Sequence, residues 1–205
     1  MKNSQAYQSL VDQMNATGRM RAEGYDERLW DGLYDWEIEE AEQLVWNQFV
    51  NKNDAEIAVL LPKLKKFDGI SALKNRLKKC NLPSDESISI AQILYEHTKE
   101  GSYLDLMMEN IMKSQYKLSY VARLIYLKPE KKVYEALKNI YLKCDDPTVR
   151  DTAVTGLLYN KGIIKNPLNM QEIFMNVALK RKFVSENASE RAKILEAFEV
   201  GGLTP

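Results

Sequence analysis

The sequence is poor in the residues that build most catalytic and metal sites. Its 205 residues include one histidine, His97, and two cysteines, Cys80 and Cys144. A catalytic triad or a histidine metal site would have to use His97, which lies at the expected end of a helix, where the helix dipole favours a partly exposed imidazole. The chain contains no HExxH, CxxC, GxSxG or Walker-type motif. We therefore expect no cofactor and no metal ion, and a binding protein rather than an enzyme.

The chain also lacks net charge and long apolar runs. Lys+Arg and Asp+Glu both number 29, whereas a dedicated nucleic-acid binder usually carries a basic excess. This balance disfavours nucleic acid as the partner without excluding it. No apolar run approaches the ~18 residues of a membrane span, and the first residues, MKNSQAYQSLVDQMNATG, lack the apolar core of a signal peptide. We expect a cytoplasmic protein without membrane association.

Residues that interrupt helices are scarce. Nine glycines and six prolines fall mostly between periodic segments. No run alternates apolar and polar residues as a half-buried strand does, and Leu, Ile, Lys, Glu and Ala are common. The composition predicts an all-α protein.

A repeat is visible in the second half of the chain. ALKNRLKKC at 72–80 matches ALKNIYLKC at 136–144 in six of nine positions, 64 residues apart. IAQILY at 90–95 matches VARLIY at 121–126, 31 residues apart, and Ala91, Ala122 and Ala153 continue that spacing. The unit is thus 31–33 residues long, and the matched cysteines read as small buried residues.

Each unit is predicted to be a helix pair. Units are expected at about 69–98, 102–127, 129–162 and 167–199, with Ser84, Ser114 and Pro167 near helix starts. In the third unit, Asp145 or Asp146 caps the second helix and Pro147 fits its first turn. Gly156 lies inside that helix at a cost of roughly 1 kcal/mol, which predicts close approach of a neighbouring helix.

The stretch DDPTVRDTA, residues 145–153, resembles the start of the second helix of a HEAT repeat. The resemblance covers residues 54–199 and implies an α-solenoid of about four HEAT-like helix pairs, whose second helices line a concave surface. It also implies that Arg150 bonds between repeats. At a spacing of 31, the positions that match Arg150 are Ser119 and Ile88, so we expect no arginine ladder there. Arg123 and Arg150 are candidate binding residues on the second helices.

Residues 1–53 do not match the repeat and are predicted to form a helical cap, within a single structural domain that continues over 54–200. The segment 26–46 holds all three tryptophans and eight acids against one arginine, whereas 61–80 holds seven basic residues against one acid. One interpretation is a cap whose aromatic stripe packs on the first repeat and whose acids pair with the lysines. The other is a partner-binding helix with exposed aromatic anchors in an acidic surround. Its candidate binding residues are Trp30, Tyr34, Trp36, Glu39 and Glu40.

The function predicted from these features is a non-catalytic protein-interaction module, such as a partner-specific regulator or immunity-type protein. The partner would be another protein, held on the concave face or by the acidic, aromatic N-terminal helix. The alternative is a DNA-binding enzyme, because bacterial alkylpurine DNA glycosylases are built from HEAT-like repeats with tryptophans and an acid in a basic groove. Here the tryptophans lie among acids in the N-terminal region.

Overall fold

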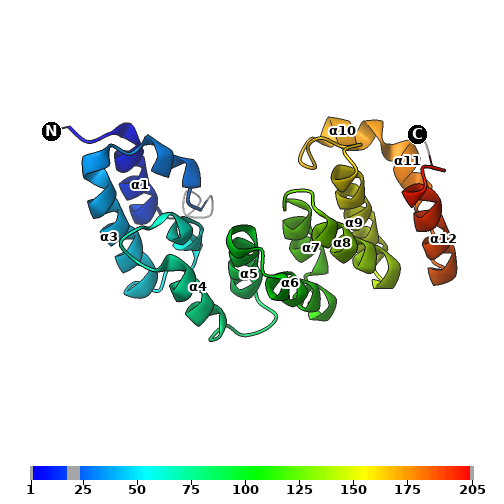
Figure 1. Ribbon diagram of the computed structural model, residues 1–205, viewed down its shortest axis with the longest axis horizontal. Helices are drawn as coiled ribbons and strands as arrows, with labels where there is room; N and C mark the ends of the chain where they lie inside the picture. The colour runs from blue at the N-terminus through cyan, green and yellow to red at the C-terminus, as the bar shows by residue number, and fades with distance from the viewer. Residues whose placement is uncertain (1, 18–23, 204–205) are drawn as a thin grey trace. The chain divides into compact units, whose positions relative to one another are not determined.

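The computed structural model describes residues 2–17 and 24–203, and within these ranges the chain is helical with no β-strand. The prediction of an all-α protein is thereby confirmed. Contacts divide the chain into two compact units, Met1–Cys80 and Asn81–Pro205; Figure 1 shows the helices of each. No helix of the described residues is long and apolar enough to cross a membrane.

Unit 1 is built from three α-helices and three 3₁₀ segments. In chain order these are α1 (Gln5–Asn15), η1 (Glu27–Gly32), η2 (Asp35–Glu37), α3 (Ile38–Val50), η3 (Glu56–Lys63) and α4 (Gly69–Leu77). The apolar face of α3 contributes Ala41, Val45 and Phe49 to the buried core. Segment η3 packs on both α3 and α4, and a Cβ on Gly69 would lie 2.0 Å from the Leu61 carbonyl oxygen, so this contact requires glycine.

The expectation of one aromatic helix over 26–46 is wrong. The segment breaks into η1, η2 and the start of α3, so Trp30 and Tyr34 precede the helix that carries the buried stripe. The cause is a contact that is distant in sequence. Glu37 is buried and accepts hydrogen bonds from the Tyr34 amide at 2.8 Å and from the amide and hydroxyl of Ser4 at 2.7 and 2.6 Å. The Glu37 carboxylate thus holds a turn where the pattern predicts continuous helix.

Unit 2 contains eight α-helices among its described residues. They are α5 (Asp85–Thr98), α6 (Gly101–Lys113), α7 (Lys117–Ile125), α8 (Lys131–Lys143), α9 (Pro147–Asn160), α10 (Met170–Met175), α11 (Val177–Arg181) and α12 (Ala188–Glu199). Helix α9 is the centre of the packing, because it contacts α7, α8 and α11. One apolar cluster runs from α5 to α12 and includes the predicted stripe of α8, with Val133, Leu137, Ile140 and Tyr141.

The local signals of α9 are confirmed. Asp146 is its N-cap, with the carboxylate accepting from the amides of Thr148 and Val149, and Pro147 occupies the first turn. A Cβ on Gly156 would lie 2.8 Å from side-chain atoms of Ile125 and Leu137. The close approach is therefore real, but it involves side chains of α7 and α8 rather than their backbone.

The predicted pairing of helices differs from the packing in three places. Helices α4 and α5, expected to form one pair over 69–98, belong to different units, and α5 packs on α6 instead. Ser114 ends α6, and the N-cap of α7 is Tyr116, whose amide donates to the Ser114 hydroxyl. Pro167 precedes α10 by a turn that is capped by Asn169.

Candidate functional site

Two surfaces of the described residues expose apolar side chains beside charged ones. The first lies at the junction of η2 and α3, and we call it the aromatic patch: Tyr34, Asp35, Trp36, Glu39 and Glu40. The Tyr34 and Trp36 rings lie 6.1 Å apart between centroids and are 52% and 45% exposed. The three acids are exposed as well. The sequence analysis named four of these residues as binding candidates, and the structure brings them together at one place.

Trp30, the other candidate of that segment, is only half-buried and lies in η1. Trp46 stacks on Phe67 with centroids 4.7 Å apart, so it belongs to the packing of unit 1. Among the tryptophans, Trp36 is therefore the exposed one.

Not all acids of 26–46 belong to the aromatic patch. Glu37 fixes the turn described above, and the hydrogen bonds from Ser4 and Tyr34 keep the pKa of its carboxyl below the usual value although burial opposes this. Glu42 is buried and accepts from the amides of Lys65 and Lys66 at 3.0 and 2.6 Å. These two carboxylates hold the fold and are not available to a partner.

Basic side chains of the 61–80 segment meet the acids, as the cap interpretation expects. Lys66 pairs with Glu39 at 2.5 Å and Lys63 with Asp31 at 3.5 Å. Both pairs are exposed at one partner or both, and exposed pairs contribute little to stability. Glu39 is thus partly neutralised, whereas Asp35 and Glu40 flank the aromatic rings on the other side of Trp36 in sequence.

Arg150, predicted as a possible ligand contact, is buried and bonded within the fold. Its guanidinium donates to the carbonyls of Cys144 and Asp145 at 3.1 and 2.8 Å and to both oxygens of Glu186 at 2.8 Å. Arg123 is half-buried on α7. The structure does not bring Arg123 or Arg150 together with the aromatic patch residues, since these lie in the other unit.

A second arginine repeats this geometry and was missed by the sequence analysis. Arg191 donates to the carbonyls of Ser185 and Glu186, the positions six and five residues before it, as Arg150 does with Cys144 and Asp145. It also donates to the Leu142 carbonyl at 2.8 Å. Each arginine lies four residues after an N-cap, Asp146 or Asn187. The spacing of 41 residues hid the match, but the cap-to-arginine offset would have found it.

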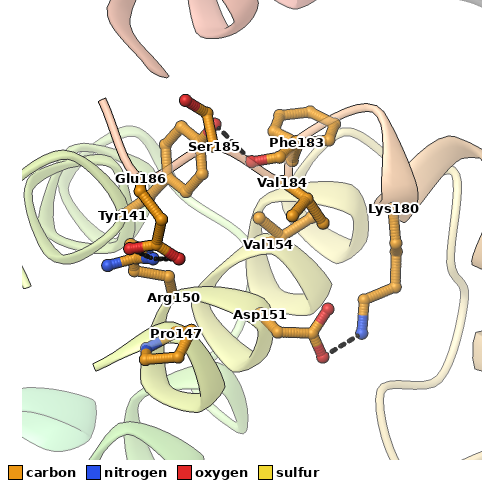
Figure 2. A pocket seen from close by; sticks show the side chains of 10 residues that line it. All are labelled: Tyr141, Pro147, Arg150, Asp151, Val154, Lys180, Phe183, Val184, Ser185 and Glu186. Carbon is orange, nitrogen blue, oxygen red and sulfur yellow. Dashed lines mark hydrogen bonds and ion pairs between the residues drawn. The ribbon is translucent and has the colours of Figure 1, made fainter. Parts of the chain in front are cut away.

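A small pocket lies beside Arg150 (Figure 2). It encloses about 60 Å³, room for ordered water but not for an organic ligand. Lys180 spans one edge and pairs with Asp151 at 2.7 Å. Tyr141 donates its hydroxyl to the Phe183 carbonyl at 2.8 Å. Burial raises the pKa of this hydroxyl to about 12, although the nearby Arg191 and Arg150 lower it. The phenol therefore stays neutral, and the pocket holds the fold together.

The second exposed surface, the C-terminal groove, is next to this pocket. It has a volume of about 210 Å³ and is lined by five apolar residues, Met170, Ile173, Phe174, Val177 and Val184, with Asp151, Lys180 and Arg181. Met170, Phe174 and Val184 are 74%, 76% and 73% exposed. Figure 2 shows Val184 and the Lys180–Asp151 pair between the pocket and the α11 side of the groove. Single exposed apolar side chains are ordinary, but a contiguous group of this kind marks a binding surface.

The groove is held by a rigid support. Ile173 packs against the core, and Leu179 and Phe183 are buried. The loop before α10 is fixed by Glu172, whose carboxylate accepts from the amides of Lys165 and Asn166 at 2.7 and 3.1 Å. The apolar side chains are thus exposed although the backbone that carries them is well bonded.

The groove has a basic surround. Residues 161–184 contain five Lys and Arg, and the single acid, Glu172, is engaged by the loop before α10. Sequence reasoning missed the groove because its apolar residues looked like helix core. The available signal was Ile173-Phe174-Met175, three consecutive apolar residues that a six-residue helix cannot bury on one face.

No group of three or more His, Cys, Asp or Glu residues in 2–17 and 24–203 is arranged to hold a metal ion. Comparison of the chain with protein-family models, with curated proteins and with solved structures gave no match. The functional conclusion therefore depends on the two surfaces.

Proposed function

We propose that the protein is a non-catalytic protein-binding module and that the C-terminal groove holds a helical segment of its partner. One observation carries the proposal: five apolar residues line a groove on a well-bonded support, and three of them are more exposed than buried. Large exposed apolar groups of this kind are costly in water, and a partner that covers them recovers the hydrophobic free energy.

We also propose that unit 2 is a short HEAT-like solenoid. Support comes from the N-cap, proline and arginine of α9, and from Arg191 of α12, which repeats the hydrogen bonds of Arg150. Consecutive contacts of α5 with α7 and of α7 with α9, beside those of α6 with α8, agree with stacked helix pairs. Such modules bind proteins by their surfaces.

The chemistry of the groove defines the occupant. Methionine and phenylalanine adapt to large apolar side chains, and an amphipathic helix presents such side chains at intervals of three and four residues. The basic residues around the groove complement acids on the flanks of that helix. The occupant is accordingly an amphipathic helix with an apolar face and acidic flanks.

Phe174→Asp should abolish this binding. We expect a fluorescein-labelled designed helix of about 15 residues, with leucine on one face and glutamate on the other, to bind the wild-type protein. The variant should bind about thirtyfold more weakly, the ratio that corresponds to loss of a ~2 kcal/mol hot spot. Fluorescence anisotropy measures both affinities. Phe174 is exposed, so the circular dichroism spectrum should not change.

Matched controls separate the groove from general stickiness. Tyr116 is an exposed aromatic residue of the same unit, and Tyr116→Asp should leave the affinity unchanged. A peptide with lysine in place of glutamate should bind weakly, because the groove surround is basic. Equal loss in both variants would refute the assignment, and so would binding to phosphatidylserine vesicles without binding to the acidic peptide.

A further inference from the structure

The two exposed surfaces of this chain are complementary to each other. The aromatic patch presents Tyr34 and Trp36 between the acids Asp35 and Glu40. The C-terminal groove presents Met170, Phe174 and Val184 in a basic surround. One surface thus has rings and negative charge, and the other has an apolar hollow and positive charge. These are the features that the occupant and the groove of the proposed function require.

We infer that a second copy of the chain is the partner: the aromatic patch of one copy docks into the C-terminal groove of the next. The inference rests on the proposed function, because it names the occupant of the same groove. Tryptophan and tyrosine are the residues most enriched among interface hot spots, and Trp36 is the exposed tryptophan of the described chain.

The contact is heterologous, since each copy offers a different surface to its two neighbours. Such contacts generate closed rings when the rotation between copies closes, and open filaments when it does not. Each copy therefore leaves one patch and one groove unoccupied at the ends of an open assembly. The charge component also makes the association weaker at high salt, because ions screen exposed charges beyond a Debye length of ~8 Å at physiological ionic strength.

Two variants and their mixture test the inference. We expect the wild-type chain to show concentration-dependent growth in sedimentation velocity. The groove variant Phe174→Asp and the double patch variant Trp36→Ala with Glu40→Lys should each stay monomeric. Mixed in equal amounts, they should form a complex of two chains and no larger species, because one supplies the intact patch and the other the intact groove. Tyr116→Asp and Asp105→Lys are the matched controls and should assemble as the wild type does.

Three results would overturn the inference: a wild-type chain that is monomeric at every concentration, a mixture that does not pair, or a patch variant that assembles normally. The designed acidic helix separates this failure from failure of the proposed function. If the wild type does not self-associate but binds the peptide with loss in Phe174→Asp, the groove binds a foreign helix and only the self-association is wrong. If the peptide does not bind either, the proposed function is wrong too. Competition of the Phe174→Asp protein against the peptide for the groove of the patch variant would support both.

Discussion

Phe183→Ala should lower the free energy of unfolding by about 3–5 kcal/mol, the usual cost of truncating a buried phenylalanine. The ring is 3% exposed. It meets Tyr141 and Phe198 edge-to-face, with centroids 5.6 and 5.1 Å apart. Removal leaves a cavity between α8, α11 and α12, the helices that position the C-terminal groove. Urea denaturation followed by far-ultraviolet circular dichroism measures the loss.

The neighbouring residue is the matched control. Val184 is 73% exposed, so Val184→Ala should change stability by no more than about 0.5 kcal/mol. Because all three tryptophans lie in unit 1, tryptophan fluorescence reports on that unit in the same samples. Comparable losses in the two variants would mean that the aromatic cluster does not hold the C-terminal helices.

Arg150→Met should cost about 2–3 kcal/mol, because hydrogen bonds from a charged group contribute about 1.5–3 kcal/mol. Methionine keeps the aliphatic packing of arginine but removes the donors to the carbonyls of Cys144 and Asp145. The last turn of α8 and the first of α9 then lose their shared donor. The midpoint and slope of urea denaturation give this difference.

The Glu186 pair is the comparison for this prediction. Its carboxylate is 78% exposed although the arginine is buried, and exposed pairs are worth at most about 1 kcal/mol. Glu186→Gln should therefore cost much less than Arg150→Met. If the two substitutions cost the same, the ion pair and not the carbonyl hydrogen bonds would be the important interaction.

The features that depend on neighbouring residues could be predicted from the sequence. The cap and proline of α9 follow from Asp146 and Pro147 alone, and the apolar stripe of α8 follows from its period. The exposure of Trp36 followed from its place off the stripe. These signals act within one turn or one helix, so a sequence reader has all the information they need.

The failures concern contacts between distant residues. The break of 26–46 depends on Glu37 and Ser4, 33 residues apart, and no local pattern in 26–46 indicates it. Tyr126 matches the buried Tyr95 in sequence, but α7 ends at Ile125, so the tyrosine is 46% exposed.

The C-terminal groove could not be predicted for a related reason. An apolar residue at helical spacing is exposed or buried according to what packs on it, and α10 has little of the chain packed against it: it contacts α11 and has no fully buried residue. Only the structure shows that Phe174 points away from the core that Ile173 joins.

The central claim is that the C-terminal groove binds an acidic amphipathic helix, and methionine methyl groups test it most directly. The protein would be labelled with ¹³C at the methionine methyl carbons and titrated with the designed acidic helix. Met170 lines the groove and Met175 is exposed on the same helix, whereas Met107 is buried in α6. We predict saturable shifts of the Met170 and Met175 signals and none of Met107. Unchanged Met170 and Met175 signals, with or without shifts of Met108 and Met112, would contradict the account.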